Sequence, residues 1–208
     1  MNVNEQKVLV LNNLVEHYGY QDWWEADNRL ADWLSMILIQ RTTEKNAKQA
    51  LANLAPYLDL DSLIEMDKAK LEELIYPAGF YKQKSIYIKA LAEWFYGHGA
   101  SLDKFQNSTE ALRKELLGIK GVGEETADAM LLYIFERNVF IADLYARRLF
   151  TRLGFGEYTT YAQMRDEFMP IIENIPHKLC KEWHSVIDVH GKHFGKDKSM
   201  NEAWLLES

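Results

Sequence analysis

Apolar residues recur at the spacing of an α-helix along almost the whole chain, and no other feature constrains the fold more strongly. In two runs the apolar side chains lie mostly three or four residues apart and so share one helix face. These runs are Leu30, Trp33, Leu34, Ile37 and Leu38, and Ile86, Ile88, Leu91, Trp94 and Phe95. We find no segment with the strict alternation of a half-buried strand.

Prolines are rare in the middle of the chain. The range Ala78–Met169 contains none, so it can hold about four helices joined by short turns. Thr160 with Gln163, and less closely Asn107 with Glu110, have the spacing of a capping box at a helix start. The sequence therefore predicts an all-α protein.

Length and composition exclude several classes of protein. The 208 residues, 48% of them apolar, suffice for one large domain or two small ones. No apolar run approaches the roughly 20 residues that cross a bilayer, and the start of the sequence lacks a signal-peptide layout. We therefore expect a cytoplasmic protein with no membrane partner. The only cysteine, Cys180, excludes an intrachain disulfide and any zinc or iron–sulfur site built from several thiolates of this chain.

The formal net charge of −7 argues against a partner bound through one broad basic surface. Net charge is only a sum, because backbone N–H groups and a few local cations can still bind phosphate. The motifs therefore decide the function.

The most informative motif is Gly121-Val122-Gly123, which lies between an amphipathic helix and an apolar helix. The two glycines permit a tight turn and leave backbone amides uncovered, while Val122 can enter the core. A helix that starts near Gly123 presents N–H groups and the positive end of its dipole, which suits one phosphate. Taken alone, such a motif is more often a plain connection between two helices.

The wider pattern makes this motif more specific. Ile141-Ala142-Asp143 follows the hairpin, and three further segments stand in a fixed order around it: Ile39-Gln40-Arg41-Thr42, Ala78–Lys84 and His190-Gly191-Lys192. Together they resemble the endonuclease III superfamily of helix-hairpin-helix DNA glycosylases. The resemblance implies two helical lobes with a cleft between them. One is a six-helix barrel over residues 21–137 that ends in the hairpin, and the other combines residues 1–20 and 138–208.

Two departures from the family pattern are informative. Where strand-cleaving members carry a Schiff-base lysine, this chain has Glu125, and Lys120 lies before the glycines. A carboxylate cannot form an imine, so we expect a monofunctional hydrolase without efficient AP lyase activity. Gly195 stands where cluster-bearing members have their first cysteine, which implies no iron–sulfur cluster and no required cofactor. With Trp23-Trp24, these features resemble the cluster-free 3-methyladenine DNA glycosylase branch.

Asp143 is the predicted catalytic residue. A glycosylase breaks the bond from C1′ to the base through a transition state with positive charge on the sugar, which a nearby carboxylate stabilises. The carboxylate can also orient or deprotonate the attacking water, and the sequence does not separate these roles. Asp143 is equally placed to cap a helix that begins at Leu144, and capping is compatible with catalysis.

The resemblance also implies which residues handle the damaged base. Because the target base must leave the stack, Gln40 fills the gap and Arg41 contacts a phosphate or the orphaned partner base. Trp23, Trp24 and Glu125 form the base pocket, whose aromatic faces suit a purine made cationic by alkylation. Without the resemblance, Gln40 and Arg41 read as a solvated helix end, and an adjacent Trp pair as ordinary core.

Backbone amides and a few cations would hold the DNA phosphates. The residues implied are Lys120, Gly121, Val122, Gly123, Arg147, Arg148 and Lys192. Hairpins of this family commonly bind a monovalent cation through backbone carbonyls, here those of Leu117, Ile119 and Val122, so a structural Na⁺ or K⁺ is implied. The predicted partner is double-stranded DNA that contains a damaged base, bound by a monomer.

The preferred function is excision of alkylated purines, 3-methyladenine above all. One alternative is an endonuclease III-like glycosylase and AP lyase acting on oxidised pyrimidines, which Glu125 and the missing cysteines disfavour. Another is a non-catalytic hairpin protein that only recognises damaged or bent DNA, against which Asp143 counts. Related members place a further aromatic where this chain has Thr43 and Glu44, so the lesion preference stays open.

Overall fold

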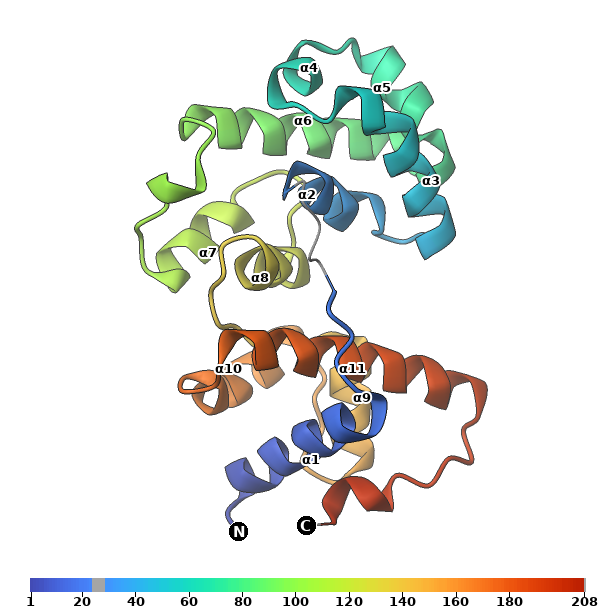
Figure 1. Cartoon of the computed structure of the whole chain (residues 1–208), viewed down its shortest axis with the longest axis vertical. Helices are drawn as coiled ribbons and strands as arrows, with labels where there is room; N and C mark the ends of the chain where they lie inside the picture. The colour runs from blue at the N-terminus through green and yellow to red at the C-terminus, as the bar shows by residue number, and fades with distance from the viewer. Residues whose placement is uncertain (24–28, 208) are drawn as a thin grey trace. The chain divides into compact units, whose positions relative to one another are not determined.

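The computed structural model describes residues 1–23 and 29–207 (Figure 1). The chain is 70% helical, and no strand occurs in the described ranges. The all-α prediction is therefore confirmed.

The α-helices follow one another with short connections. In chain order they are α1 (Val3–Tyr18), α2 (Arg29–Leu38), α3 (Glu44–Leu54), α4 (Leu60–Glu65), α5 (Lys68–Ile75), α6 (Tyr81–Gly97), α7 (Thr109–Leu117), α8 (Glu124–Tyr133), α9 (Leu144–Arg152), α10 (Tyr161–Ile172) and α11 (His177–Lys196). Four 3-10 turns are η1 (Ala55–Tyr57), η2 (Tyr76–Ala78), η3 (Leu102–Lys104) and η4 (Ala203–Leu206) in the described ranges. No helix in these ranges is long and apolar enough to pass through a bilayer.

The helices form two compact units. The central unit, Ala26–Phe135, contains α2 to α8. The terminal unit combines Met1–Glu25 with Glu136–Ser208 and contains α1 and α9 to α11. Within the terminal unit α1 packs against α11 (Figure 1), so both ends of the chain are needed to build one core.

An aromatic cluster forms part of the core of the central unit. The Trp33 ring of α2 is 2% exposed and lies 4.5 Å from the Phe95 ring of α6. The cluster continues from Trp94 to Phe105, with ring centroids 5.1 Å apart, and from Phe105 to Phe135 at 4.9 Å. Burial of one such large side chain contributes about 2 kcal/mol. The two runs that predicted helices in the sequence thus supply Trp33, Trp94 and Phe95 of this cluster.

Lys84 is a buried lysine that ties α6 to two other segments. Its ammonium donates hydrogen bonds to Leu38 O at 2.7 Å and to Ala78 O at 2.9 Å, and the residue is 2% exposed. These bonds satisfy carbonyls at the end of α2 and in η2, which those elements cannot pair themselves. Burial lowers the pKa of Lys84 to about 8.

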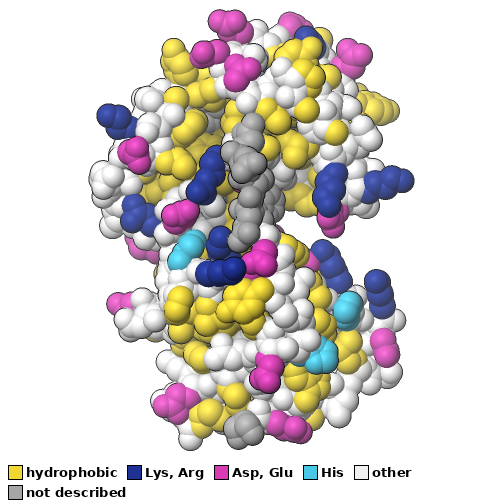
Figure 2. Space-filling model, in the orientation of Figure 1, with side chains coloured by type: hydrophobic (Ala, Val, Ile, Leu, Met, Phe, Trp, Pro, Cys, Tyr) yellow, Lys and Arg dark blue, Asp and Glu magenta, His cyan; other side chains and the backbone are white. Residues whose placement is uncertain are grey.

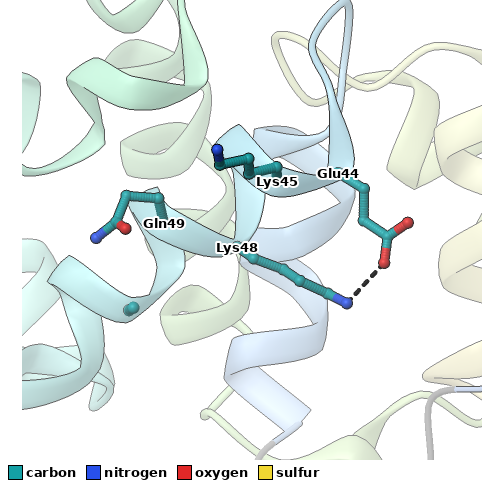
Figure 3. A pocket seen from close by; sticks show the side chains of 5 residues that line it. Glu44, Lys45, Lys48 and Gln49 are labelled. Carbon is teal, nitrogen blue, oxygen red and sulfur yellow. Dashed lines mark ion pairs between the residues drawn. The ribbon is translucent and has the colours of Figure 1, made fainter.

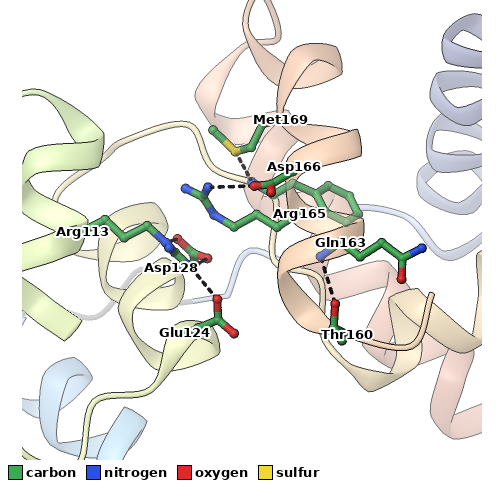
Figure 4. A network of polar contacts seen from close by, with 9 residues as sticks. Arg113, Glu124, Asp128, Thr160, Gln163, Arg165, Asp166 and Met169 are labelled. Atoms are coloured by element: carbon green, nitrogen blue, oxygen red, sulfur yellow. Dashed lines mark hydrogen bonds and ion pairs between the residues drawn. The ribbon is translucent and has the colours of Figure 1, made fainter.

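The start of α10 follows the sequence prediction in part. Thr160 Oγ1 accepts a hydrogen bond from Gln163 N at 3.2 Å (Figure 4). The Gln163 carboxamide oxygen, however, accepts from Thr159 N rather than from Thr160 N. The reciprocal bond of the capping box is therefore displaced by one residue.

The start of α7 corrects the sequence prediction. Its cap is Ser108, whose Oγ accepts from Ala111 N at 3.3 Å. Asn107 does not cap the helix, because its amide donates to Glu115 Oε1 at 2.6 Å. The longer Asn side chain finds a charged acceptor further along the helix, which leaves the cap to the adjacent serine.

Polar contacts dock the segment that follows α11. Glu202 accepts two hydrogen bonds from Arg152, at 2.8 and 2.6 Å, and its Oε1 lies 2.7 Å from His190 Nε2. Asn13 of α1 donates to Glu207 O at 2.8 Å. Cys180 is buried, which raises the pKa of its thiol to about 12. The segment after His190-Gly191-Lys192 is thus held by side-chain pairing and packing.

We predict that Lys84→Met destabilises the protein by about 2 kcal/mol at pH 7, because two buried carbonyls lose their donor. The folded pKa of Lys84 lies below its unfolded value, so the unfolded chain binds more protons between about pH 8 and pH 10. The free energy of unfolding of the wild-type protein therefore rises with pH over this range. The variant has no Lys84 and lacks this contribution. The destabilisation should therefore be larger at pH 9 than at pH 7, by about 1 kcal/mol.

Urea unfolding at the two pH values measures this difference. Lys82→Met, at an exposed position of the same helix, is the control and should change stability little at either pH. An equal or smaller loss for Lys84→Met at pH 9 contradicts the prediction.

Candidate active site and DNA-binding hairpin

The hairpin between α7 and α8 is built around two buried side chains. Ile119 is 6% and Val122 7% exposed, so the turn is anchored in the core of the central unit. Gly121 has a φ of +92°, and a Cβ at this position would lie 2.1 Å from the Tyr87 ring. Only glycine satisfies both the backbone conformation and the close approach. The sequence-based expectation that Val122 enters the core agrees with this geometry.

One part of the predicted phosphate site needs correction. The Val122 amide donates to Ile119 O at 3.0 Å and so closes the turn itself. Its hydrogen is used inside the protein, which removes Val122 from the set of amides offered to a phosphate. The helix α8 begins after Gly123, and the first amides of a helix have no carbonyl partner within it. The Gly123 amide and the first turn of α8 thus keep the positive helix end that the sequence predicts for a phosphate site.

A buried ion pair braces the two helices of the hairpin. Arg113 of α7 donates from Nε to Asp128 Oδ1 at 2.8 Å and from Nη2 to Asp128 Oδ2 at 3.2 Å (Figure 4). Glu124 Oε1 lies 3.5 Å from the same guanidinium. Asp128 is fully buried, so this two-point contact fixes α8 relative to α7.

Gln40 contacts the hairpin in this structure. Its Nε2 donates to Gly121 O at 3.1 Å and to Thr126 Oγ1 at 3.2 Å. The side chain predicted to enter the DNA stack therefore also holds the turn between α2 and α3 against the hairpin. Both segments belong to the central unit.

Arg41 lies beside an exposed aromatic residue that sequence reasoning did not single out. Its guanidinium is 5.1 Å from the centroid of the Phe80 ring, and Phe80 is 58% exposed. Both residues have positive φ, +54° for Arg41 and +48° for Phe80. In the sequence, Phe80 belongs to the Ala78–Lys84 segment. The resemblance of that segment to the family was the only indication of a role for Phe80.

Asp143 is held by the helix that it caps. It precedes α9 in an extended conformation, and its Oδ1 accepts a hydrogen bond from Ala146 N at 2.7 Å. The residue is 8% exposed, and its other oxygen, Oδ2, lies 3.9 Å from His184 Nε2 of α11. The capping role considered for Asp143 in the sequence is therefore present, and it leaves Oδ2 outside the helix's own hydrogen bond.

Trp23 lies near His184, which is itself a neighbour of Asp143. A buried glutamate holds the backbone just before Trp23 against α11. Glu182 of α11 accepts from Gln21 N at 2.6 Å and from Asp22 N at 3.1 Å. The Trp23 ring stands edge-on to the His184 imidazole, with centroids 6.1 Å apart. The partner Trp24 lies outside the described residues. Glu182 and His184 were not predicted, since nothing in the sequence marks a polar residue on a helix face as buried.

Two of the predicted phosphate-binding cations have partners inside the terminal unit. Lys192 Nζ lies 2.5 Å from Asp188 Oδ2 and 5.8 Å from the Trp23 centroid. Arg147 Nη1 donates to Thr159 O at 3.0 Å. Both cations are thus less available to DNA than the sequence suggested, whereas Arg148 is exposed.

The predicted site residues fall into two groups. The terminal unit brings together Asp143, Trp23 and Lys192, with His184 between the first two. The central unit holds the hairpin, Gln40 and Arg41, and it also carries Glu125, which is exposed in the first turn of α8. Each group is a local arrangement of its own unit.

The helix α3 carries a surface hollow that is separate from these groups. It has a volume of about 540 Å³ and is lined by Glu44, Lys45, Lys48, Gln49 and Ala52 (Figure 3). Lys48 pairs with Glu44 at 2.6 Å, and Thr43 caps the helix by accepting from Asn46 N. The two positions at which related proteins carry an aromatic residue thus serve a helix start in this chain.

On the face shown in Figure 2, acidic and basic side chains both occur on each unit. In the described ranges, no group of three or more His, Cys, Asp or Glu side chains is arranged to hold a metal ion.

Comparison with known proteins decides the family. The model of the HhH-GPD superfamily base excision DNA repair protein matches residues 34–174. The chain belongs to this superfamily. A protein of Methanocaldococcus jannaschii named "Putative DNA repair glycosylase" is 38% identical over 195 residues, which cover 90% of this chain and 87% of that protein. The recognition made from the sequence motifs is confirmed.

Solved structures of the superfamily have the same fold. The H. pylori 3-methyladenine DNA glycosylase bound to 1,N6-ethenoadenine has a TM-score of 0.73 at 24% identity and covers 97% of this chain and 100% of its own. Endonuclease III in a non-covalent complex with DNA has a TM-score of 0.78 at 19% identity, over 99% of this chain and 95% of its own. At these identities the likeness shows the fold alone. Through its family, the protein is a DNA glycosylase of base excision repair.

We predict that Arg113→Met destabilises the protein by about 3 kcal/mol, because Asp128 is left buried without its cation. The double variant Arg113→Met/Asp128→Leu should recover most of that loss, since it removes the stranded charge as well. Urea unfolding measures both, with Lys114→Met, exposed on the same helix, as the control. A double variant that is no more stable than Arg113→Met contradicts the view that this ion pair braces α7 and α8.

Proposed function

We propose that this glycosylase hydrolyses the N-glycosidic bond of alkylated purines, 3-methyladenine above all, and leaves the DNA strand intact. The observation that carries the proposal is Glu125, exposed in the first turn of α8, two residues after Gly123. By the resemblance, strand-cleaving members place their Schiff-base lysine at this position. A carboxylate cannot form an imine. The fold is shared with both the H. pylori 3-methyladenine glycosylase and endonuclease III, so the assignment rests on Glu125.

Asp143 is the catalytic carboxylate in this proposal. As the bond from C1′ to the purine nitrogen breaks, its electron pair leaves with the base and the sugar becomes positive. The Asp143 carboxylate stabilises that charge, since Oδ1 is already held by Ala146 N and needs no rearrangement. Water then bonds to C1′ and passes a proton to Asp143 or to solvent, which leaves an abasic site and free base.

Trp23 supports recognition of a cationic base. Its ring already has the Lys192 ammonium 5.8 Å from its centroid, so it offers a face that attracts positive charge. A purine alkylated at N3 or N7 carries such charge and departs easily, so little acid catalysis is required.

The hairpin is the proposed binding site for double-stranded DNA. The protein would bind the DNA as a monomer. Lys120 and Arg148 are exposed cations, and the amides of Gly121 and Gly123 would face a phosphate. Gln40 and Arg41 are assigned to the gap left by the extruded base, with Arg41 supported by the Phe80 ring.

We also propose a structural Na⁺ or K⁺ at the hairpin, held by the carbonyls of Leu117, Ile119 and Val122 as the resemblance implies. Ile119 O accepts the Val122 amide, and a carbonyl oxygen has a second lone pair for an ion. No other cofactor is required in this proposal.

The proposal is tested by incubating the protein with a methylated duplex and identifying the released bases by chromatography. We expect free 3-methyladenine and an uncleaved strand that carries an abasic site. Release of oxidised pyrimidines with strand cleavage would favour the endonuclease III-like alternative. DNA binding without release of any base across a broad lesion panel would favour a non-catalytic binder.

We further predict that borohydride traps little wild-type protein on abasic DNA and traps Glu125→Lys, because the variant places an amine where the family forms its imine. Glu124→Lys is the matched control, with the amine one residue away in the same turn, and should trap no more than wild type. Efficient trapping of the wild-type protein would contradict the assignment as a monofunctional hydrolase.

A further inference from the structure

His184 of α11 faces the predicted catalytic carboxylate. Its Nε2 lies 3.9 Å from Asp143 Oδ2, while Oδ1 is held by Ala146 N. The two carboxylate oxygens therefore have different neighbours. The backbone of α9 holds one, and an imidazole from α11 stands beside the other.

The imidazole is itself confined. The Trp23 ring stands edge-on to it, at an interplanar angle of 88°, and Glu182 docks the backbone before Trp23. The His184 side chain is 17% exposed and that of Asp143 11%. Among the described residues, the Lys192 charge acts on the ring, and Lys192 pairs with Asp188 on the same helix. Little room remains for the imidazole, and so for Oδ2, to turn.

The charge state of the imidazole suits this position. Burial, helped by the Lys192 charge, lowers the pKa of His184 to about 4, so the ring is neutral at pH 7. A cationic ring beside Oδ2 would offset the negative charge on which stabilisation of the sugar depends. The 3.9 Å separation is longer than a hydrogen bond, and catalytic hydrogen bonds commonly tighten when substrate binds.

We propose that His184 is a positioning residue for Asp143, a confined neighbour that keeps Oδ2 in one orientation. The proposal rests on the assignment of Asp143 as the catalytic carboxylate. It gives His184 no contact with the reacting atoms.

The first test compares single-turnover excision of 3-methyladenine with duplex affinity. His184→Ala should lower the excision rate about tenfold while Kd for the duplex changes less than about twofold, and His184→Gln should restore most of the rate. His184→Ala should also add nothing to the loss caused by Asp143→Asn, because the two residues act as one unit. Additive losses, or equal rates for the Ala and Gln variants, overturn the proposal.

His98→Ala is the matched control for this comparison. His98 also faces a carboxylate, with Nε2 3.4 Å from Glu115 Oε2, but in the central unit. Its loss should leave the excision rate unchanged.

The second test needs no activity and separates this proposal from the proposed function. In ¹⁵N NMR of the full chain, Asp143→Asn should shift the His184 Nε2 resonance and leave that of His98 in place. No shift overturns the proposal even in an active enzyme. A shift in a protein that releases no base supports the Asp143–His184 contact and overturns the proposed function instead.

Discussion

The hydrogen bond from the Ala146 amide to Asp143 Oδ1 is the constraint on which the catalytic account depends. A carboxylate that caps a helix is oriented by backbone, which cannot move without unwinding the first turn of α9. The helix N-terminus also favours negative charge at this position. One residue therefore supplies a helix start and a fixed anion, and the apolar run from Val139 to Ala142 buries the backbone that leads to it.

The hairpin of the central unit is fixed by several independent contacts. Val122 and Ile119 are buried, the Tyr87 ring lies against Gly121, Arg113 pairs with Asp128, and Gln40 bonds to Gly121 O. Under the proposed function, a turn held in this way would present its amides without a reorganisation cost, so that a protein with a net charge of −7 could bind phosphate through few cations. Arg147 and Lys192 each contact a partner in their own unit, which likewise leaves few cations for phosphate.

The sequence predicted what depends on periodicity and local chemistry. The helical runs at Trp33 and Leu91, the buried Val122 and the cap at Asp143 all follow from residues near in sequence. The long-range polar contacts could not be predicted in this way. Glu182 and His184 are ordinary polar residues until folding places them against the segment before Trp23 and against Asp143, respectively.

Short-range competition between polar side chains also limited the sequence prediction. Asn107 was expected to cap α7, yet it bonds to Glu115 and the cap falls to Ser108. The Val122 amide was counted among phosphate donors, yet it closes its own turn. In both cases the polar group bonds to a partner nearby in the fold, and spacing alone does not rank such a partner against the predicted one.

The single-turnover rate of 3-methyladenine release by Asp143→Asn tests the central claim most directly. Asn is as good a helix cap as Asp, so the variant should unfold at nearly the same temperature as wild type. The account predicts a rate at least about 100-fold lower, because the fixed negative charge beside the sugar is lost. A folded variant that releases the base within about threefold of the wild-type rate would contradict it.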